Sequence, residues 1–376
     1  MIQAHNRKAL EGKAAGLSPT GRGCKMGASQ GWRPRRDRRE MEHVEPIVIG
    51  GREFLWGHRT YIMAILNVSA DSFAGDGVGY DVEEALERAR RMAQEGADIL
   101  DVGGESTRPG AAPVDVEEER RRVLPVIRRL ARELAIPISI DTYKAEVAEV
   151  AIKAGAHMVN DIWGFRQDPE MAPVVAHYGV PAVVMHNQRG QPATDVAGGA
   201  VGGTPRDSWF RGDPAGPDGS GTTGRAIPLR GSPGPGGLGT TGRAEGPGGL
   251  DTMEYILAGL RRSLAIAREA GVEERQLIVD PGFGFGWTVA ENLDILRRLG
   301  EMRALGRPIL VGTSRKSTIG HVLGLPVEER LEGTAATVAV AIAAGADVVR
   351  VHDVKAMARV CRMTDAVVRG WEGPML

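Results

Sequence analysis

The stretch DVEEALERARRMAQEGADILDV, residues 81–102, contains one complete helix-to-strand unit. Asp81 can cap a helix, and Glu84 completes a capping box three residues later. Apolar side chains then recur at helical spacing, which predicts an amphipathic helix over 81–95. Gly96 suits the left-handed residue that follows a helix, and the β-rich run after it predicts a buried strand.

This unit repeats along the chain. The same ending recurs in Gly155-Ala156-His157 and Gly345-Ala346-Asp347. The apolar runs predict eight strands: Tyr61–Val68, Ile99–Val102, Ile136–Ile140, Met158–Ile162, Ala182–Met185, Leu277–Val279, Ile309–Val311 and Val348–Val351. Helical patterns separate them, at about 81–95, 116–134, 143–154, 169–178, 252–270, 289–305, 327–344 and 353–368. Such alternation predicts parallel strands with crossover helices, and eight repeats favour a closed (β/α)8 TIM barrel in the α/β class. An open doubly wound sheet is the rival, but no G-x-G-x-x-G motif follows the first strand.

Two segments differ from the rest. Residues 1–42 are basic and carry no apolar stretch of the secretory type, so we expect a disordered tail; a nucleic-acid arm is the weaker alternative. Residues 190–249 hold 19 Gly and 8 Pro, and GTTGRA occurs there twice. They have too few apolar residues to offset the entropy of ordering, which predicts a disordered, low-complexity insertion after the fifth strand. We therefore expect residues 43–376 to form one catalytic domain.

The composition excludes several classes of protein. The net charge of −1 argues against a basic nucleic-acid binder. Two cysteines, Cys24 and Cys361, are too few for a disulfide scaffold. No apolar run is long enough to span a membrane, so no membrane partner is expected. Together these features favour an enzyme of the reducing cytoplasm.

Every predicted strand ends in a polar side chain, and barrel enzymes carry their chemistry at the carboxyl ends of strands. A strand-end hydrogen bond would explain any one of these residues. Eight strands that each bring a polar group to the same rim indicate a site instead. The acceptors suit a flat heterocycle with N–H donors, such as a 2-amino-4-oxo pyrimidine ring; they are Asp101, Asp141, Asn160 and Asp280.

A second group at the same rim is cationic and suits phosphate, for which arginine offers a planar fork. Its members are Arg108, Lys316, Arg350 and His352. Asn67 ends the first strand and is a hard oxygen ligand, able to hold Mg²⁺ together with phosphate oxygens. The rim thus combines a heterocycle pocket with a polyanion pocket.

Seven stretches of the chain carry a family resemblance. They are ILNVSADSF at 65–73, DVGGESTRPGA at 101–111, SIDTYK at 139–144, VNDI at 159–162, DPGFGFG at 280–286, SRKS at 314–317 and RVHDV at 350–354. In this order they resemble the dihydropteroate synthases, a family of pterin-binding enzymes. The GGESTRPG and SRKS stretches are specific to that family, whereas related pterin methyltransferases share the general form of DPGFGFG.

The resemblance implies a transferase of folate biosynthesis. It condenses 6-hydroxymethyl-7,8-dihydropterin pyrophosphate with p-aminobenzoate to give 7,8-dihydropteroate and pyrophosphate. By position, the resemblance implies a pterin site made of Asp101, Asp141, Asn160, Met185, Asp280, Lys316 and Arg350. It implies a pyrophosphate site made of Thr107, Arg108, Arg350 and His352, with Mg²⁺ on Asn67. It implies a p-aminobenzoate pocket made of Phe73, Pro109, Lys316 and Ser317.

The implied mechanism is electrostatic. The C–O bond to pyrophosphate breaks early, and the cations Arg108, Lys316, Arg350 and His352 are the expected catalytic groups. The aniline nitrogen then attacks the cationic pterin methylene, and positioning replaces any strong general base. By analogy with barrels whose last helices pair, we also expect a homodimer.

The chain departs from the family pattern at three places. Ser69-Ala70 stands where Thr-Pro is usual, Ala74–Gly77 where Ser-Asp-Gly-Gly is usual, and Trp287 where Lys is common. The Trp287 change removes a cation near the pterin side. A weakly active or non-catalytic pterin-binding paralogue is therefore one alternative, and a pterin-dependent methyltransferase is another.

Overall fold

The computed structural model describes residues 44–68, 82–107, 111–188, 251–371 and 373. The predicted tail at 1–42 and the predicted insertion at 190–249 lie outside these residues. Within them, no helix combines the length and the apolar character needed to cross a membrane.

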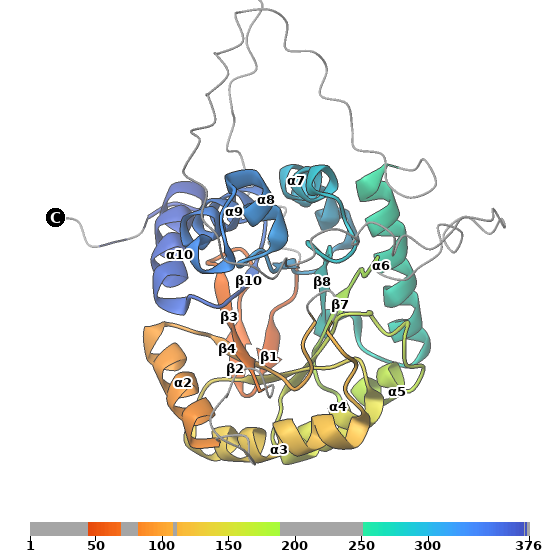
Figure 1. The fold of residues 1–376 in the computed structure, drawn as a ribbon. Helices are drawn as coiled ribbons and strands as arrows, with labels where there is room; N and C mark the ends of the chain where they lie inside the picture. Colours follow the sequence, from red (N-terminus) through yellow and green to blue (C-terminus); the bar gives the residue numbers. More distant parts are fainter. Residues whose placement is uncertain (1–43, 69–81, 108–110, 189–250, 372, 374–376) are drawn as a thin grey trace, which may run out of the picture. The chain divides into compact units, whose positions relative to one another are not determined.

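Eight parallel strands form one sheet in the order β8-β7-β6-β5-β4-β3-β10-β9. A parallel bridge between Val279 and Ile309 joins β8 to β9 and closes the ring, which confirms the predicted barrel (Figure 1). The strands are β3 (Tyr61–Asn67), β4 (Ile99–Gly103), β5 (Ile138–Asp141), β6 (Met158–Asp161), β7 (Ala182–Met185), β8 (Leu277–Asp280), β9 (Leu310–Val311) and β10 (Val348–Val351).

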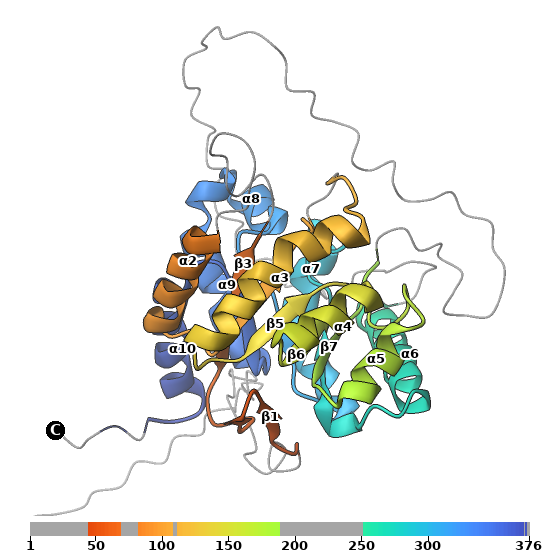
Figure 2. The ribbon, with the colours of Figure 1, turned by 90° about the horizontal axis from the view of Figure 1, so that it is seen from below.

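Helices surround the ring on its outer side (Figures 1 and 2). They are α2 (Val82–Glu95), α3 (Val116–Glu133), α4 (Ala145–Ala154), α5 (Met171–Tyr178), α6 (Thr252–Glu269), α7 (Val289–Arg298), α8 (Ser317–Leu323), α9 (Leu331–Ala344) and α10 (Val354–Val368). The glycines expected to end helices do so in the left-handed region, with φ of 109° at Gly96, 117° at Gly155 and 120° at Gly345. Short 3-10 helices at η4 (Glu274–Gln276), η5 (Leu299–Leu305) and η6 (Val327–Glu329) complete the connections.

Two features were not predicted from the sequence. One is α8, which is too short to give a clear helical period. The other is an antiparallel hairpin of β1 (Ile47–Ile49) and β2 (Arg52–Phe54), whose three-residue strands are likewise too short for a periodic signal. Gly50 and Gly51 form its turn with φ of 55° and 76°.

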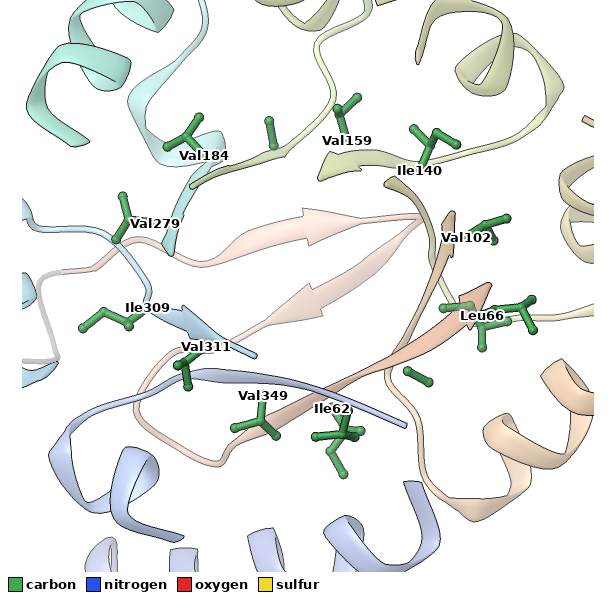
Figure 3. Packing of buried hydrophobic residues seen from close by; sticks show 14 of the residues in the cluster. Ile62, Leu66, Val102, Ile140, Val159, Val184, Val279, Ile309, Val311 and Val349 are labelled. Atoms are coloured by element: carbon green, nitrogen blue, oxygen red, sulfur yellow. The ribbon is translucent and has the colours of Figure 1, made fainter. Parts of the chain in front are cut away.

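The hairpin fills one end of the barrel. Its apolar side chains form one cluster with Trp56, Tyr61 and inward-facing residues at the starts of the barrel strands. Phe54 and Tyr61 pack with ring centroids 4.7 Å apart. Figure 3 shows the hairpin crossing the middle of the ring of strands. The opposite end, where the strands finish, is the end that carries the polar residues.

A larger cluster lies between the strands and the helices. Alternate strand residues such as Ile62, Leu66 and Val102 belong to it, and they are buried against the surrounding helices (Figure 3). Because strand side chains alternate between faces, each strand has one helix-facing set and one set that faces the barrel axis.

Candidate active site

Strand pleating decides which polar groups reach the barrel mouth. In β4, Ile99 belongs to the inner cluster, so Asp101, two residues later, also faces inward. In β10, Val348 belongs to the inner cluster, so Arg350, two residues later, also faces inward. The same alternation of side chains places Asp141, Asn160, Met185 and Asp280 on the inner faces of their strands. The structure therefore gathers the six strand residues of the expected pterin site on one inner surface.

Arg350 links three strands across this mouth. Its Nε donates to Asp101 Oδ2 at 2.6 Å, and its Nη2 donates to Asp141 Oδ2 at 2.6 Å. Asn160 Nδ2 donates to the same oxygen of Asp101 at 2.9 Å. The partners in these hydrogen bonds are 59 to 249 residues apart in the sequence, so the barrel alone brings them together.

One carboxylate oxygen of this group, Asp101 Oδ1, has no hydrogen-bond donor among the described residues. The Asp101 side chain is fully buried. An unpaired buried carboxylate oxygen is costly unless a ligand or water pairs with it. Oδ1 is therefore available to an N–H donor that enters the mouth.

Burial changes the acidity of the carboxyls. Loss of water raises the pKa of Asp141 to about 7; Arg350 opposes this rise and Asp101 adds to it. Burial also raises the pKa of Asp280 to about 6, against the hydrogen bond from the Gly282 N–H. The pKa of Arg350 is lowered by burial but raised on balance by Asp101 and Asp141, so its guanidinium stays charged.

Lys316 reaches the mouth from the loop after β9. Its Nζ lies 4.0 Å from the centroid of the Phe285 ring, a cation–π contact. Gly284 has φ of 79°, and a Cβ there would lie 2.8 Å from Lys316 Cδ. The Gly-rich loop after β8 is thus a tight turn that lets its backbone approach Lys316.

His352 and Ser314 join the last two strand ends. Ser314 Oγ lies 3.0 Å from His352 Nδ1 and accepts the His352 backbone N–H at 3.2 Å. Burial, then Arg350 and Arg315, lower the pKa of His352 to about 3. His352, expected as a cationic or potentially cationic group, is neutral near pH 7. Ser317, the first residue of α8, is exposed.

Asn67 is the last residue of β3 and sits beside Asp141. A Cβ on Gly103 would lie 3.7 Å from Asn67 Oδ1 and 3.6 Å from Asp141 Oδ2, so the glycine keeps open the space between these oxygens. The described residues contain no cluster of three or more His, Cys, Asp or Glu side chains that could hold a metal. Any magnesium here would take few protein oxygens and depend on substrate phosphate and water, as Mg²⁺ commonly does.

The loop after β4 is anchored at its root by charges that the sequence analysis did not single out. Lys144 Nζ donates to Glu105 Oε2 at 2.5 Å and also bonds the buried carboxylate of Glu119. Arg122 Nη1 donates to the Gly104 carbonyl at 2.8 Å. This loop carries Thr107, the last described residue before the gap. Arg108 and Pro109, and likewise Phe73 with the altered first loop, lie outside the described residues.

Trp287 packs away from the barrel axis. It is 8% exposed and belongs to the cluster between strands and helices. Its ring stacks on His186 with centroids 5.8 Å apart and meets the edge of Tyr255. The side chain at position 287 therefore supports the loop after β8 from behind.

A model of the family described as "Pterin binding enzyme" matches residues 63–352. The chain belongs to the pterin-binding enzyme family. A dihydropteroate synthase of Clostridium beijerinckii is 42% identical over 322 residues, which are 85% of this chain and 99% of the relative. These are the family and the branch that the sequence motifs predicted.

Solved structures of the family agree with the barrel. The dihydropteroate synthase of Clostridium difficile, crystallised with pteroic acid, is 43% identical with a TM-score of 0.68, covering 84% of this chain and 99% of its own. The Xanthomonas albilineans enzyme in complex with 7,8-dihydropteroate is 34% identical with a TM-score of 0.64, covering 86% and 98%. This pterin-binding chain therefore shares fold and sequence with dihydropteroate synthases over most of its length.

Proposed function

We propose that this chain is an active dihydropteroate synthase of folate biosynthesis. It joins 6-hydroxymethyl-7,8-dihydropterin pyrophosphate to p-aminobenzoate and releases 7,8-dihydropteroate and pyrophosphate. The observation that carries the proposal is the inward-facing set of Asp101, Asp141, Asn160 and Asp280 around Arg350, with Asp101 Oδ1 unpaired among the described residues. A pterin ring offers the N–H donors that such acceptors need.

Binding of the pterin changes the partners of Arg350. The ring N–H groups compete for the carboxylate oxygens that the guanidinium now uses. In our proposal the displaced guanidinium covers the ring face and reaches toward the pyrophosphate. The bidentate geometry of arginine suits both tasks.

The charges around the ring favour bond cleavage before attack. Three carboxyls (Asp101, Asp141 and Asp280) face two cations (Arg350 and Lys316), so the mouth carries one net negative charge once the pH exceeds the raised pKa of Asp141, about 7. This excess stabilises a cationic pterin methylene as pyrophosphate leaves. The p-aminobenzoate amine then attacks that carbon and loses a proton, and the enzyme supplies orientation.

Magnesium is part of the proposal. Asn67 would hold it, with the remaining ligands from pyrophosphate and water, and the ion would neutralise the leaving anion. The site in this chain fits that role because Gly103 leaves the side of Asn67 Oδ1 open.

We also propose a homodimer, built on α9 and α10. These helices pack on each other and expose Val340, Met363 and Val367 at 49%, 65% and 59%. Large apolar side chains exposed on two neighbouring helices favour a protein partner. Equilibrium sedimentation of the full chain tests this, with Met363→Glu expected to give monomers.

We place the enzyme in the cytoplasm. Cys361, a buried free cysteine, is compatible with a reducing compartment.

Pyrophosphate release by the purified chain tests the activity. We expect release that requires both p-aminobenzoate and Mg²⁺ for full rate. Pterin binding without turnover would identify a non-catalytic paralogue instead, and methyl transfer from methyltetrahydrofolate would identify a methyltransferase.

Arg350→Ala should lower turnover by at least about 100-fold, because it removes the main cation of the mouth. Near-normal turnover in this variant would contradict the role assigned to Arg350.

A further inference from the structure

The contact between Ser314 and His352 defines the chemical state of the histidine. We propose that Ser314 is a positioning residue that holds His352 as the tautomer protonated at Nε2, a hydrogen-bond donor directed at the leaving diphosphate. This inference rests on the proposed function for the identity of the anion. The tautomer itself follows from hydrogen-bond geometry.

The hydroxyl of Ser314 has two neighbours on His352. It accepts the backbone N–H at 3.2 Å and lies 3.0 Å from Nδ1. Ser314 is 4% exposed, and within the described residues its hydroxyl makes no other hydrogen bond.

These two contacts select the direction of the second bond. If Nδ1 carried the proton, the Ser314 oxygen would accept twice and its own O–H would be buried without an acceptor, which is costly. If Nδ1 is bare, the hydroxyl donates to it and accepts from the backbone, and both groups are satisfied. The ring proton of neutral His352 then sits on Nε2.

The surroundings keep the ring neutral. Arg350, Arg315 and Lys316 act against a positive charge on His352, and Asp353 is the neighbouring group that favours it. Asp353 is itself paired with Arg315, at 3.0 Å and 2.5 Å. With burial, these groups hold the pKa of His352 near 3.

Hydrogen bonds from the start of α9 fix the turn that carries Ser314. Arg315 adopts φ of 58°, and its backbone N–H donates to Thr334 Oγ1 at 3.1 Å. Arg330 Nη1 donates to the Arg315 carbonyl at 3.0 Å. The turn that carries Ser314 and Lys316 is thus fixed to the start of α9 by these bonds and to Asp353, after β10, by the ion pair of Arg315.

This state gives His352 one role and removes another. Nε2–H lies at the far edge of the ring from Ser314 and can donate to an anionic oxygen, while Arg350 and Lys316 supply positive charge. The lone pair at Nδ1 is occupied by the Ser314 hydroxyl. His352 therefore does not take the proton from the attacking amine.

Nitrogen NMR of the full chain, labelled with 15N-histidine and free of substrate, tests the tautomer. His352→Gln identifies the resonances. We expect a pyridine-type Nδ1 and a pyrrole-type Nε2 for His352 near neutral pH. A pyrrole-type Nδ1, or an imidazolium, would overturn the proposal whatever the activity of the chain.

Ser314→Ala should shift His352 toward a mixture of tautomers, and Ser314→Thr, which keeps the hydroxyl, should restore the Nε2–H form. Ser139→Ala is the matched control, because the buried Ser139 hydroxyl has no partner among the described residues. An unchanged His352 spectrum in Ser314→Ala contradicts the assignment. The wild-type spectrum remains a test even if a variant does not fold.

Kinetics test the link to the diphosphate. Ser314→Ala should raise KM for the pterin pyrophosphate about 5-fold, the value of one ordinary hydrogen bond, and leave KM for p-aminobenzoate unchanged. An unchanged pterin KM despite an altered tautomer would refute this link. A wild-type chain with no turnover would refute the proposed function and leave the tautomer result standing.

Discussion

Arg350→Met removes the guanidinium that joins Asp101 to Asp141 and keeps a side chain of similar length. Both carboxyls are buried, at 0% and 7% exposure, and each loses a bond of 2.6 Å. Breaking a buried ion pair by removing one partner costs about 3–5 kcal/mol, because the remaining charge is left uncompensated. We expect a loss of this size in the free energy of unfolding at about pH 8, measured by urea denaturation.

The loss should depend on pH. The folded protein holds the pKa of Asp141 at about 7, above its ordinary value of 3.8. A raised folded pKa contributes stability that is fully present below the unfolded value and is lost as pH rises through the folded value. At about pH 5.5, Asp141 is protonated in the folded state, so Asp101 alone loses a charge partner and the variant should be less destabilised than at about pH 8.

A matched surface arginine provides the control. Arg129 also binds two carboxylates, Glu83 at 2.7 Å and Glu133 at 2.8 Å, but its side chain is 41% exposed. Arg129→Met should change stability little, since exposed pairs are screened by water. A cost for Arg350→Met no larger than that for Arg129→Met, or an equal cost at the two pH values, would contradict a role for the buried ion pairs in stability.

Three further outcomes are expected. Gly282→Ala should lower the free energy of unfolding, measured by thermal denaturation, by at least about 2 kcal/mol, because a Cβ there would lie 1.9 Å from the carbonyl oxygen of His186, the residue after β7. Gly271→Ala is the control, because Gly271 has a similar φ but open space around it. Equal losses in the two variants would contradict the clash. Lys144→Met should lower the free energy of unfolding by roughly 1–3 kcal/mol and reduce kcat/KM, whereas Lys153→Met, in an exposed pair within α4, the helix that follows Lys144, should do neither. Asn67→Ala should raise the Mg²⁺ concentration for half-maximal activity at least about 10-fold, and an unchanged magnesium titration would remove Asn67 from the metal site.

The sequence predicted the barrel, and it predicted which polar strand residues face the barrel axis. Helix and strand periods are local properties of neighbouring residues, so the βα repeats could be read directly. The alternation within each strand likewise determined that Asp101 and Arg350 share the face of their apolar neighbours Ile99 and Val348. The short hairpin and α8 could not be predicted from the sequence, because segments of three to seven residues are too short to show a helical or strand periodicity of apolar residues.

The tertiary structure decided what those groups do to one another. Arg350 pairs with Asp101 and Asp141 because barrel closure places their strands around one axis, and such pairing between distant segments leaves no local signal. The pKa of Asp141 near 7 and the neutral state of His352 arise from burial, which exists only once the barrel has formed. Trp287 shows the same limit: its place in the sequence suggested the pterin side, and packing put it behind the loop.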